Sequence, residues 1–223
     1  MSTNLVQLYH EENNIPSVLL NSLEFMFVDG DGEPVMTKIE SELKKVLQRY
    51  PDTTLFITQG FICTNDKGEV DNLKRGGSDY SASLIGAAIN ADVVEIWTDI
   101  DGIHNNDPRI VKNTHPIAEM SFDEAAELAY FGAKILHPST VLPAKVKNIP
   151  VLLKNTMEPH AKGTTISNKV TGTGIKAIAA KDGLTAIKIK SGRMLLAYGF
   201  LCRVFEIFEK YKTPIDLITT SEV

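Results

Sequence analysis

Arg75, Gly76, Gly77, Ser78 and Asp79 stand side by side, directly before an apolar run. The first turn of a helix offers unpaired backbone N–H groups and partial positive charge, and two glycines let an anion approach them. Arg75 can present a fork to a carboxylate, Ser78 can cap the helix, and Asp79 can orient a cation or an ammonium group. A free amino acid carries both a carboxylate and an ammonium group and could therefore be the ligand. A capped glycine turn with a solvated arginine explains the same residues and is the commoner arrangement by pattern alone.

A second polar stretch, WTDIDGIHNNDPR at 97–109, follows a predicted strand. Ligands of open α/β sheets bind beyond the carboxyl ends of strands, so this loop could hold ribose hydroxyls and phosphates. Its candidate residues are Thr98, Asp99, Asp101, His104, Asp107 and Arg109. Ile103 and the missing late glutamate argue against an EF-hand. A solvated Asx-rich loop accounts for the pattern as well.

Two shorter stretches are less informative. FGAKILHP at 131–138 places Lys134 near a predicted helix end, where a cation also simply favours the helix dipole. DGDGEP at 29–34 predicts a turn.

Helices and strands alternate along most of the chain. Helices are predicted over 4–14, 39–50, 79–90 and 122–136, and strands over 15–20, 53–62, 92–98 and 149–155. Capping boxes at Thr37/Glu40 and Ser121/Glu124 open two of the helices, and His137-Pro138 ends the last. The pattern predicts an α/β fold in which these strands form one mostly parallel sheet, covered by helices on both faces. Residues 75–79 and 98–109 should then share one sheet edge.

The pattern changes after 168–174, which reads as a linker. Strands over 184–191 and 214–220 with a helix over 199–211 predict a small α+β unit. We therefore expect two domains, 1–170 and 171–223. A first helix without a preceding strand, and a last strand without a partner, suggest a fragment of a longer protein.

Composition restricts the function class. With 43% hydrophobic and 23% charged residues and a net charge of −5, the chain is an ordinary globular protein without a general nucleic-acid or membrane surface. No apolar stretch approaches a transmembrane span, and the N-terminus lacks the features of a signal peptide. Two distant cysteines and five scattered histidines predict unpaired thiols, a cytoplasmic location and no zinc site.

RGGSDYSAS, WTDIDGIHNNDPR and FGAKILHP, in this order, closely resemble aspartokinases of the amino-acid kinase family. ITQGFI at 57–62 and LITTSEV at 217–223 extend the resemblance over practically the whole chain. It implies an α/β kinase domain followed by the start of an ACT-type regulatory region. It also implies transfer of the ATP γ-phosphoryl group, with Mg²⁺, to the side-chain carboxylate of L-aspartate, the first step towards lysine, threonine and methionine.

The resemblance assigns roles to single residues. Arg75 would hold the substrate carboxylate, in a site lined by Phe61, Gly76, Gly77 and Ser78. Asp79 and Lys134 would be catalytic, Asp79 by orienting cationic groups around the reacting oxygens. The ATP-binding residues would be Thr98, Asp99, His104, Arg109, Lys134 and Ile135. An amino-acid effector would meet Met194, Gly199, Phe200, Leu201, Asp216, Thr220 and Ser221.

The sequence departs from the family pattern in three places. An aromatic phenol is more usual where His104 stands. The Lys-Phe-Gly-Gly segment of these kinases and a substrate-binding glutamate are absent from the 223 residues. We therefore expect the chain to be inactive by itself.

Three interpretations of the chain remain open. The first two are a fragment of a monofunctional, lysine-type aspartokinase and a fragment of a bifunctional aspartokinase-homoserine dehydrogenase, and TTSEV agrees better with the first. The third is a catalytically silent protein that pairs through its ACT unit. The intact protein is expected to be a homo-oligomer that binds L-aspartate, ATP and an amino-acid effector, and neither nucleic acid nor membrane.

Overall fold

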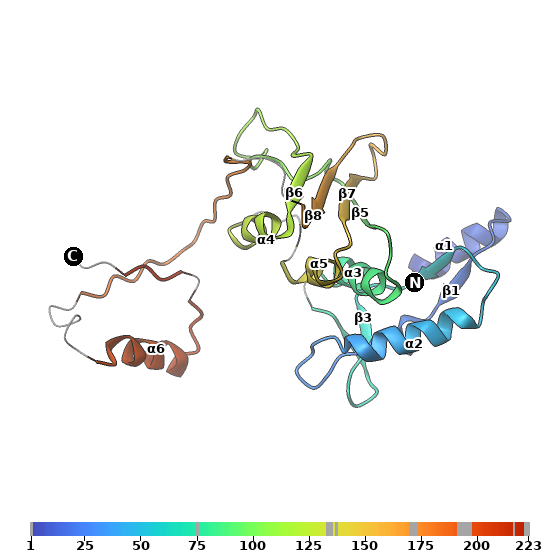
Figure 1. The fold of residues 1–223 in the computed structure, drawn as a ribbon, viewed down its shortest axis with the longest axis horizontal. Helices are drawn as coiled ribbons and strands as arrows, with labels where there is room; N and C mark the ends of the chain where they lie inside the picture. The colour runs from blue at the N-terminus through green and yellow to red at the C-terminus, as the bar shows by residue number, and fades with distance from the viewer. Residues whose placement is uncertain are drawn as a thin grey trace. The chain divides into compact units, whose positions relative to one another are not determined.

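The computed structural model describes residues 2–74, 76–132, 136, 138–169, 174–190, 198–215 and 217–220. The chain divides into two compact units, Met1–Lys181 and Asp182–Val223. Each unit is described by itself below, and Figure 1 shows the elements of both. Among the described residues, no helix is long and apolar enough to cross a membrane.

The first unit opens with a parallel strand pair and two helices. α1 spans Ser2–Glu12, β1 Val18–Leu20, η1 Ser22–Glu24, α2 Met36–Gln48 and β2 Phe56–Thr58. β1 and β2 run parallel, with Leu20 opposite Thr58. α2 buries Ile39, Leu43 and Val46, a spacing that places three apolar side chains on one helical face. The predicted turn at 29–34 is confirmed, since Gly32 N–H donates to Asp29 O at 3.0 Å.

A hairpin and a central helix follow. β3 (Ile62–Thr64) pairs antiparallel with β4 (Val70–Asn72), and α3 spans Gly77–Ile89. α3 packs against α2 and also against β5 (Val94–Thr98) and α5 (Leu142–Lys147). Leu84 belongs to the core around Phe25 and Ile39, whereas Ala82 packs on the core around Phe122 and Val151. α3 is therefore apolar on more than one side because it lies between two cores.

The second core fills one side of a four-stranded mixed sheet of order β5-β7-β8-β6. β7 spans Val151–Asn155, β8 Thr164–Ser167 and β6 Glu119–Ser121, and the remaining elements are α4 (Phe122–Tyr130) and η2 (Pro138–Val141). β5 runs parallel to β7, β7 antiparallel to β8, and β6 parallel to β8. β7 alternates buried and half-buried residues, with Val151 and Leu153 fully buried.

Several expectations for this unit were wrong in detail. Among the described residues, β1–β2 and β5–β7 belong to separate sheets and do not form one. α2 begins at Met36, so Thr37 and Glu40 lie inside the helix and form no capping box. The box of Ser121 and Glu124 is confirmed at the start of α4. That helix ends at Tyr130, and Gly132 two residues later adopts φ 127°, which is not a helical conformation.

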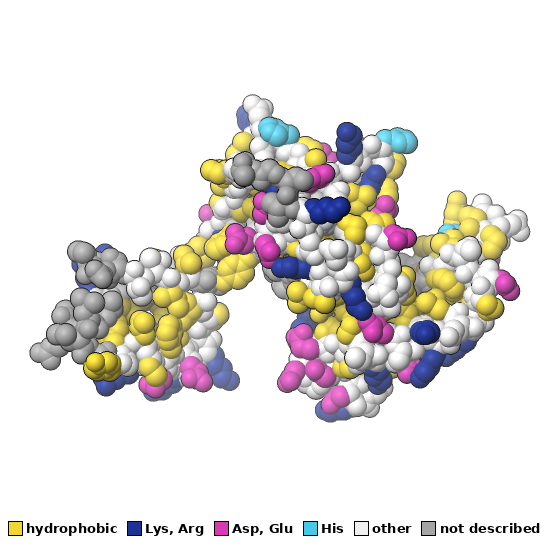
Figure 2. All heavy atoms as spheres, viewed as in Figure 1, with side chains coloured by type: hydrophobic (Ala, Val, Ile, Leu, Met, Phe, Trp, Pro, Cys, Tyr) yellow, Lys and Arg dark blue, Asp and Glu magenta, His cyan; other side chains and the backbone are white. Residues whose placement is uncertain are grey.

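The second unit contains one described helix, α6 (Phe200–Lys210), which has no buried residue. In Figure 2, charged side chains line the lower edge of this unit, and hydrophobic side chains gather above them. The strands predicted at 184–191 and 214–220 are wrong for the described residues, none of which is in a strand there. A strand forms only when its backbone hydrogen-bonds to a neighbouring strand. An alternating sequence favours an extended chain but does not by itself provide that neighbour. The ACT-like unit therefore stays a prediction.

Candidate functional site

The polar stretch at 75–79 lies at the start of α3. Gly76 caps the helix in the left-handed conformation (φ 70°), and no side chain accepts a capping hydrogen bond. The expected cap by Ser78 is therefore wrong, because Ser78 stands in the first turn itself. Its side chain is exposed, and Asp79 beside it is half-buried. Arg75 lies outside the described residues.

Phe61 meets this helix start from the link between β2 and β3. A Cβ atom added to Gly77 would stand 2.5 Å from Phe61 Cδ2, and one added to Gly60 would stand 3.2 Å from Ser78 Cα. Real Cβ atoms essentially never come within 3.0 Å of another atom, so a side chain at Gly77 would displace the ring of Phe61. The structure thus brings Gly60, Phe61, Gly77 and Ser78 together beyond the carboxyl end of β2.

Burial shapes the electrostatics of this region. It raises the pKa of the Asp79 carboxyl group, and a hydrogen bond with Ser78 opposes the rise. Ser22, just beyond β1, donates its backbone N–H to Gln59 Oε1 at 2.9 Å. The hydroxyls of Ser22 and Thr58 are buried without a hydrogen-bond partner among the described residues. The sequence analysis gave no role to Ser22, Thr58 and Gln59, which look like ordinary strand and turn residues.

The loop after β5 is tied together by its own side chains. Thr98 Oγ1 donates to Asp99 Oδ1 at 3.0 Å. Both ring nitrogens of His104 are engaged, Nε2 with Asp101 Oδ1 at 2.7 Å and Nδ1 with Thr114 Oγ1 at 2.8 Å. The histidine therefore shapes the loop.

Arg109 is paired within the same loop. Its Nη2 lies 2.6 Å from Asp107 Oδ2, and its Nε lies 3.0 Å from Asp107 Oδ1. The hydrogen bonds with Asp107 raise the pKa of the arginine, which stays charged. The guanidinium is exposed, and a surface pair of this kind exchanges partners at little cost.

Thr164 on β8 holds the loop after β5 through hydrogen bonds of its side chain. Its Oγ1 accepts the N–H of Ile103 at 2.8 Å and donates to Ile117 O at 2.7 Å, while the residue is fully buried. Gly102 packs on the same hydroxyl, where an added Cβ would stand 2.5 Å from Oγ1. Sequence reasoning missed Thr164, because no local signal links it to a loop some sixty residues earlier.

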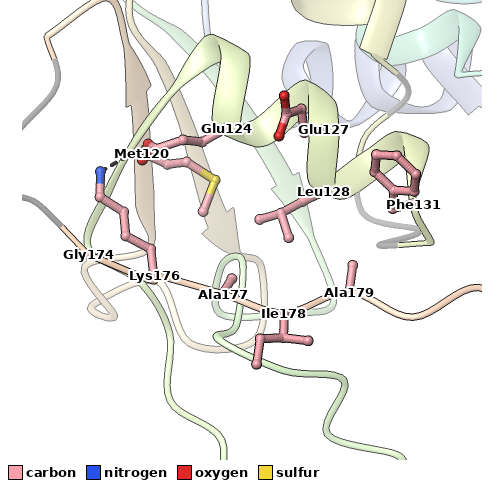
Figure 3. Close-up of a pocket in the computed structure, with 10 residues that line it drawn as sticks. All are labelled: Met120, Glu124, Glu127, Leu128, Phe131, Gly174, Lys176, Ala177, Ile178 and Ala179. Carbon is pink, nitrogen blue, oxygen red and sulfur yellow. Dashed lines mark hydrogen bonds and ion pairs between the residues drawn. The ribbon is translucent and has the colours of Figure 1, made fainter. Parts of the chain in front are cut away.

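A cavity of about 400 Å³ lies between α4 and the extended segment 174–179 (Figure 3). Met120 and Leu128 point into it, and Lys176 pairs with Glu124 at 2.9 Å at one end. Burial raises the pKa of Glu124, but its hydrogen bonds with Ser121 and Lys176 outweigh this and leave the pKa below its usual value. Lys134 and Ile135, which are predicted to bind ATP, lie outside the described residues. The described side chains contain no cluster of acidic, His or Cys groups that could hold a metal.

Comparison with known proteins identifies the family to which the chain belongs. Residues 1–155 match the profile of the amino acid kinase family. The chain belongs to the amino acid kinase family. Its fold is accordingly the α/β fold of that family, with parallel and mixed sheets and helices.

Several similar proteins are aspartokinases. Lysine-sensitive aspartokinase 3 of Escherichia coli (strain K12) is 46% identical over 170 residues, which cover 76% of this chain and 38% of that protein. The solved structure of E. coli aspartokinase III in complex with aspartate and ADP (R-state) matches 100% of this chain and 51% of its own, at 38% identity and a TM-score of 0.82. Its complex with lysine and aspartate (T-state) matches the same shares, at 36% identity and a TM-score of 0.74. The chain thus spans about half the length of these relatives, or less.

Proposed function

We propose that this chain carries the aspartate and nucleotide sites of an aspartate kinase, which transfers the γ-phosphoryl group of ATP to the side-chain carboxylate of L-aspartate. The observation that carries the proposal is the match of the whole chain, at 38% identity, to a structure that holds aspartate and ADP. The glycine-lined start of α3 supports it, because backbone N–H groups there favour an anionic group.

The aspartate would bind at the start of α3. Arg75 is proposed as the fork for its carboxylate, and Phe61, Gly76, Gly77 and Ser78 as the walls of the site. Asp79 would orient the ammonium group and the cations around the reacting oxygens. Its burial supports this role, since charge–charge interactions are stronger away from water.

The nucleotide would bind at the loop after β5. Thr98 and Asp99 are proposed to contact it directly, and Lys134 with Ile135 to meet it near the phosphates. His104 is already bonded on both ring nitrogens and would act by holding the loop, whereas the exposed Arg109 can turn from Asp107 to a phosphate. Phosphoryl transfer depends mainly on alignment and on neutralising charge, which these groups supply.

Mg²⁺ would accompany ATP. The described residues hold no cluster of acidic side chains for it, and Mg²⁺ in such enzymes takes many of its ligands from phosphates and water. The ion would add positive charge at the transferring group.

Regulation is proposed for the second part of the chain. Residues 171–223 would begin an ACT-type region after a kinase domain of 1–170, in a cytoplasmic homo-oligomer. The T-state structure holds lysine, which makes an amino acid the class of effector to test. Gly199, Phe200, Leu201 and Thr220 would contact it. Met194, Asp216 and Ser221, proposed with them, lie outside the described residues.

Calorimetric titration of the 223-residue chain with aspartate, glutamate and ADP tests the proposal. We expect aspartate and ADP to bind and glutamate to bind at least about tenfold more weakly, because one extra methylene misplaces its carboxylate. Arg75→Ala should weaken aspartate about ten- to a hundredfold and leave ADP unchanged. Equal binding of aspartate and glutamate, or no binding of aspartate at millimolar concentration, would contradict the proposal.

A hydroxamate assay for aspartyl phosphate provides the second test. The 223 residues contain no Lys-Phe-Gly-Gly segment. Because loss of one preorganised charge at a transferring group costs about a hundredfold or more, turnover by the chain alone should lie at least that far below that of the E. coli relative. Comparable turnover would show that the chain needs no such segment.

A further inference from the structure

Phe61 holds a backbone conformation that few residues other than glycine adopt. Its φ is 75°, and it lies in the short link between β2 and β3. A bulky residue in this left-handed region is strained and persists only where the surroundings hold it. The contacts on both sides of the residue therefore decide where its ring lies.

The hydroxyl of Ser81 makes one of these contacts. Its Oγ accepts the N–H of Phe61 at 2.9 Å and donates to Gly77 O at 2.8 Å. On the other side, Leu73 N–H donates to Phe61 O at 2.8 Å. Ser81 is only 3% exposed, so no water can replace the bond to Phe61 readily.

The position of the ring follows from these bonds. Ser81 stands one helical turn after Gly77, and Gly77 is the residue against which Phe61 Cδ2 packs. One hydroxyl thus connects the strained residue to the same first turn that its ring touches. Without that hydroxyl, φ of Phe61 could relax and the ring would leave the start of α3.

We propose that Ser81 is a positioning residue, which holds Phe61 in its left-handed conformation so that the ring forms one wall of the aspartate site. The aspartate part of this inference rests on the proposed function, whereas the backbone part does not. A purely local role is the competing explanation, because serines inside helices commonly donate to the carbonyl four residues back. Only the positioning role requires the bond that Ser81 accepts from Phe61.

Amide exchange in the ¹⁵N-labelled 223-residue chain tests the backbone part. Ser81→Ala should make the Phe61 amide exchange about tenfold faster relative to the amide of Thr64, which donates to Met26 O at 2.8 Å. Ser83→Ala is the matched control. Ser83 is buried on the same helix, but its Oγ accepts from Ala144 N at 3.2 Å, so the Phe61 amide should be unaffected.

Two further variants keep the test decisive if Ser81→Ala destabilises the chain. Ser81→Thr retains an oxygen that can make both bonds and should restore protection of the Phe61 amide. Ser81→Cys fills the same space with a weaker acceptor and should give an intermediate rate. Unchanged protection of Phe61 in Ser81→Ala, or equal loss in Ser83→Ala, would overturn the proposal.

Calorimetric titration of the same proteins tests the consequence for the ligand. Ser81→Ala should weaken aspartate binding about tenfold and leave ADP binding within about twofold of wild type. Equal weakening of aspartate and ADP would overturn the positioning role. Failure of the wild-type chain to bind aspartate would instead reject the proposed function, and the exchange rates would still decide whether Ser81 holds Phe61.

Discussion

Burial of Asp79 raises the pKa of its carboxyl group above the ordinary value of 3.8, and the hydrogen bond with Ser78 only partly offsets this. A carboxyl group with a raised folded-state pKa binds its proton more tightly in the folded chain than in the unfolded chain. Below the ordinary pKa the group is protonated in both the folded and the unfolded chain. The tighter proton binding of the folded chain then makes its full contribution to stability. As the pH rises through the raised pKa, that contribution is lost. At neutral pH the charge of Asp79 therefore lowers stability.

Asp79→Asn should accordingly make the chain more resistant to urea at pH 7 than the wild type. The gain should shrink as the pH falls towards 3.8, because the wild-type carboxyl group then becomes neutral as well. Urea unfolding of both proteins between pH 4 and 8 measures it. Asp52→Asn, at an exposed position in the turn after α2, is the control. A gain that is independent of pH would show that the charge of Asp79 is not the cause.

Elements differ in how far the sequence could predict them. α3, β5 and β7 are rich in apolar residues and are bounded by polar ones, so the sequence predicts them within a few residues. The predicted strand 53–62 contains only β2 and the first residue of β3, because the chain turns at Phe61. That turn depends on Gly77 and Ser81, which are distant in sequence, and local propensity cannot express such a contact. The same limit hid the anchor at Thr164.

Replacing Thr164 with valine tests this anchor. Val has the same shape but leaves the buried N–H of Ile103 and the carbonyl of Ile117 without that partner. We expect a loss of about 1–3 kcal/mol in the free energy of unfolding, and weaker ADP binding because the loop after β5 loosens. Urea unfolding and calorimetry measure the two effects. Thr165→Val, on the other face of β8, should change neither by a comparable amount. A stability loss without any change in ADP affinity would limit Thr164 to a structural role.

At the scale of the whole chain, the proposed aspartate and nucleotide regions both lie in the unit Met1–Lys181. The end of that unit is held in place by side chain and backbone. Lys176 pairs with Glu124, and Ile178 N–H donates to Asn105 O at 3.0 Å in the loop after β5. Residues 182–190 are all exposed, and none of them is in a helix or strand.

Limited proteolysis should reveal this contrast. Trypsin cleaves segments that can enter its active site in extended form, and exposed backbone without ladder hydrogen bonds does so without prior unfolding. We therefore expect the first cuts after Lys188 or Lys190, before any cut after Lys145 or Lys147 in α5, although the side chains of Lys145 and Lys147 are also accessible. Mass spectrometry of a time course identifies the products. Early cleavage in α5 would show that this helix opens as readily as 182–190. If protection of 182–190 instead grows with protein concentration, the chains associate, because only association depends on concentration. The alternating segment 184–190 would then pair as a strand with a second chain.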